Sequence, residues 1–381
     1  MAVLKFVFVL FLFRNVMNIL SACPSEICSC TRRGILNCSS RRLDRIPTFE
    51  KDTYAEVYDV IDLSHNQIYF LEPNAFKLTP ARAIAANDNP LVGISPRALV
   101  GCEQYLTKLD LHQTGLRVIH WGLFAKLHKL KSLNLSNNEL FALPVELFER
   151  LSALTELDLS YNKLTTLTDT CFYQLTALKT LNLQSNDIRH IDDDIFDNLS
   201  QLLELDLSRN QLDNVDTALG RGLSSLTFLD LSHNRLTDMP SVDALAMVSS
   251  LQKLHLDFNN ISAIAQYACS KLSKLTSLSM ANNRIASIAL TAFNGLGRLG
   301  SLDLSNNQLK SLGDECHLAG TEYLISLKLD GNPLDCTCKL AWTRSLVVNG
   351  ATVLGTCASP QSLQHTALSA VSFGSCNDID C

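Results

Sequence analysis

Cysteine is the residue type with the clearest chemical potential in this sequence, which contains 13 of them. Such clusters form disulfide frameworks in secreted proteins or zinc sites elsewhere, and their spacing alone leaves the connectivity open. Near the start, the spacing C-x4-C-x-C-x7-C joins Cys23, Cys28, Cys30 and Cys38. Near the end, the spacing C-x-C-x18-C-x18-C joins Cys336, Cys338, Cys357 and Cys376.

The other motifs that suggest chemistry do not meet its structural requirements. Gly295, Gly297 and Gly300 match the dinucleotide-binding pattern G-x-G-x-x-G, but that pattern must follow a strand and open a helix whose N-terminus faces the phosphates. Here the glycines lead into a strand-like segment, Leu299–Leu304, so we reject a nucleotide site. The sequence contains no nucleophile elbow, H-E-x-x-H motif or P-loop, and its nine histidines lack close metal-ligand spacing. We expect no catalysis, cofactor or metal.

Composition narrows the class of protein further. The net charge of −6 disfavours nucleic-acid binding, which needs a broad basic surface. Apolar residues make up 46% and charged residues 18%, a balance typical of folded rather than disordered chains. The strongly apolar run Ala2–Phe13 is shorter than the roughly 20 residues that span a bilayer. We therefore expect a folded chain without a membrane span.

The N-terminal segment Met1–Ala22 has the features of a secretory signal peptide. A basic residue, Lys5, precedes the apolar run Phe6–Phe13, and small residues precede a cleavage site. The four residues that end in Cys23 also fit a bacterial lipoprotein signal, in which this cysteine would be acylated, but its place in the cysteine cluster favours a disulfide. We expect a released, secreted chain in an oxidising compartment, which also disfavours zinc at the clusters.

An internal repeat, L-x-x-L-x-L-x-x-N-x-L, recurs twelve times at intervals of about 24 residues. Apolar residues at its fourth and sixth positions point to one side of a strand, and stacked strands would form a parallel sheet over a continuous core. At position nine an amide can satisfy backbone groups that would otherwise be buried unpaired. This column consists of Asn66, Asn89, Thr114, Asn138, Asn162, Asn186, Asn210, Asn234, Asn259, Asn283, Asn307 and Asn332.

The pattern resembles the leucine-rich repeat family over Tyr58–Leu334, and the cysteine clusters resemble the caps of its extracellular members. The resemblance implies an α/β fold: a curved horseshoe solenoid with a parallel concave sheet and disulfide-bonded caps at both ends. The implied organisation is a signal peptide at 1–22, an N-terminal cap at 23–57, twelve repeats at 58–334 and a C-terminal cap at 335–381. Family-type pairing would give Cys23–Cys30, Cys28–Cys38, Cys336–Cys357 and Cys338–Cys376.

Ten residues after the asparagine column, large aromatic residues form a spine on the outer side. The spine fails at Gly220, Ala244 and Cys269, which predicts a locally repacked core or, alternatively, a bend or softer segment. Its members are Phe76, Phe124, Phe148, Phe172, Phe196 and Phe293.

Five cysteines lie outside the caps. Cys102, Cys171, Cys269 and Cys316 occupy small or apolar columns of the repeat, so we expect buried free thiols. Cys381 fits no column, and it could pair with Cys316 or form a covalent dimer with another chain.

Four Asn-x-Ser sequons predict N-glycosylation. Asn198 on the outer side and Asn260 after the turn are the favoured sites. Asn37 adjoins Cys38, and Asn134 belongs to an expected strand, so these two rank third and fourth.

A protein partner would meet residues that point outward from the concave sheet. Position five often carries aspartate, at Asp62, Asp110, Asp158, Asp206, Asp230 and Asp303, which is common in the family and suggests a structural or solubility role. Position eight varies more and includes large side chains of the kind that anchor interfaces. The densest cluster predicts a contact patch of Phe228, Asp230, His233, His255, Asp257 and Phe258, with Tyr161 and Arg209 beside it. The alternatives are scattered surface aromatics without a role, or a metal- or pH-responsive site.

The leading prediction is a secreted, non-enzymatic protein that binds an extracellular protein through its concave face. By resemblance, its role would be matrix, adhesion, guidance or immune-type recognition. The alternatives are a stabilising, non-catalytic subunit of an extracellular enzyme complex and a soluble receptor ectodomain or decoy.

Overall fold

The structure is a computed structural model, and it describes residues 27–31, 34–47, 57–168, 171–312, 321 and 323–373. The expected signal peptide and cysteines Cys23, Cys316, Cys376 and Cys381 lie outside these residues.

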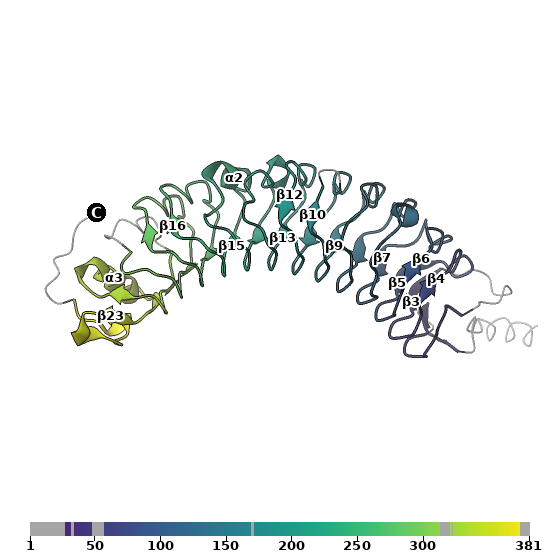
Figure 1. The fold of residues 1–381 in the computed structure, drawn as a ribbon, viewed down its shortest axis with the longest axis horizontal. Helices are drawn as coiled ribbons and strands as arrows, with labels where there is room; N and C mark the ends of the chain where they lie inside the picture. Colours follow the sequence, from purple (N-terminus) through teal and green to yellow (C-terminus); the bar gives the residue numbers. More distant parts are fainter. Residues whose placement is uncertain are drawn as a thin grey trace, which may run out of the picture.

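The described chain coils into an arch whose turns stack side by side, as the repeat predicts (Figure 1). One 15-stranded sheet runs through the arch, and all its neighbouring strands are parallel except β1 and β2. In order across the sheet, the strands are β1 (Ser29–Cys30), β2 (Ile35–Asn37), β3 (Tyr58–Asp62), β5 (Ala81–Ala85), β7 (Lys108–Asp110), β8 (Ser132–Asn134), β9 (Glu156–Asp158), β11 (Thr180–Asn182), β13 (Glu204–Asp206), β14 (Phe228–Asp230), β15 (Lys253–His255), β17 (Ser277–Ser279), β19 (Ser301–Asp303), β20 (Ser326–Lys328) and β22 (Thr352–Leu354).

Short elements form the rest of each turn. Four two-stranded parallel sheets consist of β4 (Phe70–Leu71) with β6 (Gly93–Ile94), β10 (Thr166–Leu167) with β12 (His190–Ile191), β16 (Ala263–Ile264) with β18 (Ser287–Ile288), and β21 (Leu334–Asp335) with β23 (Cys357–Ser359). The described helices are η1 (Trp121–Leu123), η2 (Arg221–Leu223), α2 (Val242–Met247), η4 (Cys338–Leu340), α3 (Thr343–Val348), η5 (Gln361–Leu363) and η6 (Leu368–Ala370).

The phenylalanine spine forms a stack inside the outer side of the arch. Phe124, Phe148, Phe172 and Phe196 are fully buried, and successive ring centroids lie 6.4, 6.2 and 6.3 Å apart. Where the spine is interrupted, the helices η2 and α2 replace its rings, and their leucines Leu223 and Leu245 are buried. Helix α2 lies on the convex side of the arch (Figure 1). The break is therefore a locally repacked core.

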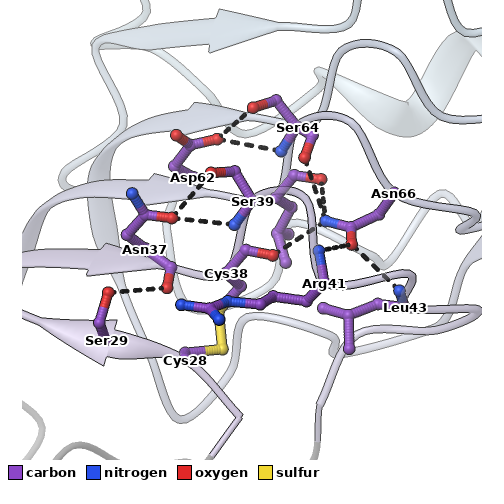
Figure 2. Close-up of a disulfide and its surroundings, with 11 residues drawn as sticks. Cys28, Ser29, Asn37, Cys38, Ser39, Arg41, Leu43, Asp62, Ser64 and Asn66 are labelled. Atoms are coloured by element: carbon purple, nitrogen blue, oxygen red, sulfur yellow. Dashed lines mark hydrogen bonds between the residues drawn. A yellow bond between two sulfur atoms is a disulfide. The ribbon is translucent and has the colours of Figure 1, made fainter.

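The asparagine column connects successive turns through buried hydrogen bonds, as predicted. Asn66 accepts the backbone N–H groups of Arg41 and Leu43 through Oδ1, at 2.9 and 3.0 Å, and donates through Nδ2 to the carbonyl oxygens of Cys38, Leu63 and Ser64 (Figure 2). At Thr114 the hydroxyl donates to the Leu111 carbonyl and approaches Asn138 Oδ1 at 2.8 Å.

Disulfides lie at both ends of the sheet. Cys28–Cys38 links the β1–β2 hairpin (Figure 2), and Cys336–Cys357 lies in the C-terminal cap. Cys30 and Cys338 are disulfide-bonded too, and the partners expected for them lie outside the described residues. Two of the four expected pairs are thus present, and strands β2 and β22 join each cap to the sheet of the repeats.

Three of the predicted filler cysteines, Cys102, Cys171 and Cys269, are buried free thiols. Burial raises the pKa of Cys102 to about 11 and that of Cys269 to about 12. At neutral pH both are therefore protonated and serve as small apolar side chains.

Candidate protein-binding surface

The concave surface is formed by the residues that flank the buried leucine of each strand. In β14, Leu229 is fully buried, whereas Phe228 and Asp230 on either side are partly exposed. The next strand repeats this pattern with Lys253 and His255 around Leu254. Since successive residues of a strand point to opposite faces, these flanking side chains project from the face opposite the core.

The structure brings four of the predicted contact residues into two ring pairs. The Phe228 ring meets the His255 ring edge-on, with centroids 5.3 Å apart and an interplanar angle of 86°. The His233 ring stacks on Phe258, with centroids 4.1 Å apart and an interplanar angle of 9°. We call Phe228, His233, His255 and Phe258 the aromatic patch. It spans two adjacent strands, β14 and β15, and the turns that follow them.

Position eight of the repeat has one backbone conformation throughout the solenoid. Eleven of the twelve residues are not glycine, yet all have φ between 52 and 57°, in the left-handed region, and the twelfth is Gly331 with φ 69°. Asparagine, aspartate and glycine tolerate this conformation best, while large side chains pay roughly 1–2 kcal/mol for it. The eleven are His65, Asp88, Gln113, Asn137, Tyr161, Ser185, Arg209, His233, Phe258, Asn282 and Asn306.

Two of the predicted contact residues, Asp230 and Asp257, use their carboxylates to accept backbone N–H groups in turns. Asp230 Oδ1 accepts the backbone N–H of Ser232 at 2.8 Å, as position-five aspartates do in other repeats. Position five of the tenth repeat is Ser279, which has no carboxylate, and Asp257 of the ninth repeat accepts the N–H of Ala281 in its place at 2.7 Å. These carboxylates thus hold the turns that support the aromatic patch, which confirms the structural interpretation of position five.

The two remaining predicted residues differ in their distance from the patch. Arg209 lies in the turn before His233, and its backbone N–H bonds the carbonyl of Ser232 at 2.9 Å. Tyr161 is half-exposed but lies four repeats from Phe258, roughly 19 Å at about 4.8 Å per strand. The structure therefore places Arg209 beside the patch and Tyr161 apart from it.

The two histidines of the patch have opposite pKa shifts. A hydrogen bond to Asp230, at 3.4 Å from His255 Nδ1, raises the pKa of His255 above its ordinary value, against the effect of burial. Burial acts to raise the pKa of Asp230, but its hydrogen bonds from His255 and Ser232 prevail and lower it. Burial, followed by the nearby Arg209 charge, lowers the pKa of His233.

These shifts predict a pH dependence for the His255–Asp230 pair. Because the His255 pKa is raised from 6.5, its stabilisation is present below that value and is lost as the pH rises through the raised pKa. Because the Asp230 pKa is lowered from 3.8, its contribution is present above that value and is lost as the pH falls through the lowered pKa. Urea unfolding should show that His255→Gln destabilises by about 0.2–1 kcal/mol near pH 5.5 and by less near pH 8.5. The exposed His128→Gln is the control, and equal losses for His255→Gln at both pH values would contradict the assignment.

An acidic strip adjoins the patch in the centre of the concave sheet. Strands β9, β11, β13 and β14 carry Glu156, Asp158, Glu204, Asp206 and Asp230 but no lysine or arginine. Burial, together with the charges of Asp230 and Asp158, raises the pKa of Asp206. Within the described ranges, neither glutamate of the strip forms an ion pair. The surface therefore suits a partner with positive charge and is unfavourable to polyanions.

In the part of the chain that the structure describes, no group of three or more His, Cys, Asp or Glu side chains is arranged to hold a metal ion. A search of the same residues finds no helix with the length and apolarity of a membrane span.

A family model for leucine rich repeats matches residues 104–143, 133–188, 176–236, 249–309 and 273–334, which together exceed half of the chain. The chain belongs to the leucine-rich repeat family. A curated relative, the transforming growth factor beta activator LRRC32 of Mus musculus, is 35% identical over 85 residues. That match covers 22% of this leucine-rich repeat chain and 13% of the relative.

Solved structures of leucine-rich repeat proteins share the fold at low sequence identity. A chain from an octameric complex of Latrophilin 3, Unc5D and FLRT2, in which FLRT2 supplies the leucine-rich repeats, matches with a TM-score of 0.68 and 23% identity, covering 93% of this chain and all of that one. Toll, from the Drosophila Toll–Spatzle complex, matches with a TM-score of 0.60 and 23% identity over 83% of this chain and 41% of its own. TLR13, from a complex with single-stranded RNA, matches with a TM-score of 0.57 and 22% identity over 82% of this chain and 53% of its own.

Sequence reasoning missed one feature of the leucine-rich repeat surface. A hollow of about 560 Å³ lies where the phenylalanine spine is interrupted, lined by residues that include Asp194, Asp197, Asp216 and Asp243. The only available signal was the excess of aspartate in this part of the sequence, which does not by itself place side chains together.

Proposed function

We propose that this leucine-rich repeat chain is a secreted, non-enzymatic protein that binds another extracellular protein through the concave face of its seventh to ninth repeats. The aromatic patch supplies the anchoring contacts, and Arg209 and the acidic strip lie at its margin. The disulfides at both ends support an extracellular location, because such bonds persist in oxidising compartments.

The observation that carries this proposal is the exposure of Phe258 together with its backbone conformation. Its side chain is 48% exposed, stacks on His233 and occupies a left-handed backbone position that disfavours a bulky residue. In the next two repeats the same position holds Asn282 and Asn306, which suit that conformation. A phenylalanine here lowers the stability of the fold and exposes apolar surface, so binding is the role that accounts for it.

The geometry of the patch fits the anatomy of protein interfaces. Interface energy is concentrated in a few aromatic and arginine residues at the centre of a contact. The structurally similar chains include leucine-rich repeat components of complexes with proteins, such as Toll with Spatzle and FLRT2 with Latrophilin 3 and Unc5D. TLR13 was solved with RNA, but the acidic strip of this chain opposes a polyanionic ligand.

Replacing Phe228 and Phe258 together by alanine should weaken partner binding by 30-fold or more, about 2 kcal/mol, because the variant removes both aromatic anchors. The tagged wild-type and variant proteins would be used to capture partners from native extracellular fluid, and the captured proteins quantified by mass spectrometry. Tyr323→Ala, which truncates an aromatic residue exposed outside the patch, is the matched control.

A second variant separates binding from folding. Phe258→Asn introduces a residue that suits the left-handed position, so it should preserve or raise the thermal midpoint while it reduces capture. If Phe258→Asn and the double alanine variant retain the same proteins as the wild type while remaining folded, this placement of the binding site is wrong.

A further inference from the structure

In most central strands the last residue, at position five, stabilises the following turn by accepting hydrogen bonds through a single side-chain oxygen atom. Asp158, for example, accepts the backbone N–H and the hydroxyl of Ser160 through Oδ1, at 2.9 and 2.7 Å. Asparagine replaces aspartate at this position in β8 and β11, and Asn37 ends β2 in the same way. In Asn134, Oδ1 accepts the backbone N–H and the hydroxyl of Ser136 at 3.0 and 2.8 Å. The turn thus requires only the oxygen of the side-chain amide.

This arrangement leaves the amide nitrogen of Asn134 available. Among the described residues, no hydrogen bond uses Asn134 Nδ2, whereas Asn138 in the asparagine column donates through Nδ2 to three carbonyl oxygens. The half-buried Asn134 lies on the concave side of β8, paired with Asp158 of β9 and Asp110 of β7.

Asn134 also opens a sequon whose hydroxyl residue is Ser136. Asn37 accepts the same two hydrogen bonds from Ser39, as Figure 2 shows, but the middle residue of its sequon, Cys38, forms a disulfide with Cys28. Asn182 in β11 is followed two residues later by Gln184, so it forms no sequon. Asn198 donates through Nδ2 to the Tyr173 carbonyl at 3.0 Å. Among the described residues, Nδ2 of Asn260 also enters no hydrogen bond, so Asn134, which ranked last from sequence alone, is distinguished by its place in a strand of the concave sheet, β8.

We propose that Asn134 carries an N-linked oligosaccharide that projects from the concave face at β8, and that this glycan covers the N-terminal half of that face and leaves the aromatic patch accessible. The inference rests on the proposed function for secretion and for the position of the partner site. In the transfer step, Asn134 Nδ2 loses a proton and bonds the anomeric carbon of the sugar. The bond from that carbon to a lipid diphosphate breaks, and the diphosphate leaves; the donor is a lipid-linked oligosaccharide of the secretory pathway.

The position of Asn134 accounts for the division of the concave face. Strand β8 lies four strands from β14, roughly 19 Å at about 4.8 Å per strand. A glycan at β8 covers the neighbouring strands β7 and β9, where the flanking residues are mostly short or charged, as at Lys108, Asp110 and Asp158. The aromatic patch on β14 and β15 remains accessible.

The test uses the full chain secreted from a eukaryotic host. Enzymatic removal of N-glycans in heavy-oxygen water, followed by peptide mass spectrometry, should label Asn134 as a former glycan site. Asn134→Asp should remove one glycan mass and keep the turn, because aspartate occupies this position in the neighbouring strands. Ser136→Thr should retain the glycan, and Asn182→Asp should leave the mass of the attached glycans unchanged. An unlabelled Asn134, or an Asn134→Asp protein with the glycan mass of the wild type, would overturn the proposal.

Partner capture tests the second half of the inference. Glycan-free Asn134→Asp should retain the partners of the wild type within about twofold, and Phe258→Asn should still reduce that capture in the same background. A tenfold gain in capture by Asn134→Asp would show that the glycan covers the contact surface and would overturn the division of the face. If Asn134 is glycosylated but Phe258→Asn has no effect, the proposed function fails while the glycan site stands.

Discussion

Replacing Phe172 by alanine is expected to lower the free energy of unfolding by about 3–5 kcal/mol, the usual loss for a buried aromatic residue. Phe172 is fully buried between Phe148 and Phe196, with ring centroids 6.2 and 6.3 Å away. The backbone bonds between neighbouring turns hold these rings at the repeat spacing, so the two neighbours cannot close the gap. Urea denaturation followed by circular dichroism would measure the loss.

Phe141→Ala is the matched control for this prediction, since the Phe141 side chain is 53% exposed and its truncation should change stability by no more than about 0.5 kcal/mol. A loss at Phe172 as small as that of the control would mean that the spine can collapse around a missing ring. Phe196→Ala, at the end of the stack next to the repacked segment, should destabilise less than Phe172→Ala because it has a stacked ring on one side only.

The scaffold could be predicted from the sequence because each position of the repeat has the same physical role in every turn. Asparagine at position nine is the clearest example, since a buried turn needs both an acceptor and donors, and Asn66 provides them to five backbone groups. Even Thr114 behaves as its chemistry predicts, with a single hydroxyl in place of an amide. Twelve repetitions of one requirement make the inference secure.

The contact surface was predicted less completely, because its residues are exceptions to the repeat. The variation at position eight was visible in the sequence, but the left-handed backbone that makes Phe258 unfavourable there was not. Asp257 was expected to contact a partner, yet it accepts the backbone N–H of Ala281 in the tenth repeat, where Ser279 replaces the usual aspartate of position five. Such compensation depends on which neighbour lies within reach, and the period of the repeat does not reveal it.

Gly222→Ala is expected to destabilise the protein by about 3 kcal/mol or more, although it adds a single methyl group. Gly222 lies in η2, pressed against the backbone of the preceding turn, where a Cβ atom would overlap the Phe196 carbonyl oxygen and the carbonyl group of Asp197. Both obstacles are backbone, so no side-chain rotation relieves the overlap. The helix would have to move outward and draw the buried Leu223 with it.

The same substitution at Gly300 separates this steric effect from the general consequences of removing a glycine. A Cβ atom at Gly300 would lie 3.6 Å from the nearest atom, the Thr276 carbonyl oxygen, which is ordinary contact. Gly300→Ala should therefore leave stability unchanged or raise it by up to about 1 kcal/mol, because alanine restricts the unfolded chain. Similar unfolding midpoints for the two variants would show that the turn at η2 has room to shift. A large loss of stability for Gly222→Ala alone would show that η2 is in direct backbone contact with the preceding turn, next to Phe196. The neighbouring strands of the aromatic patch depend on this packing.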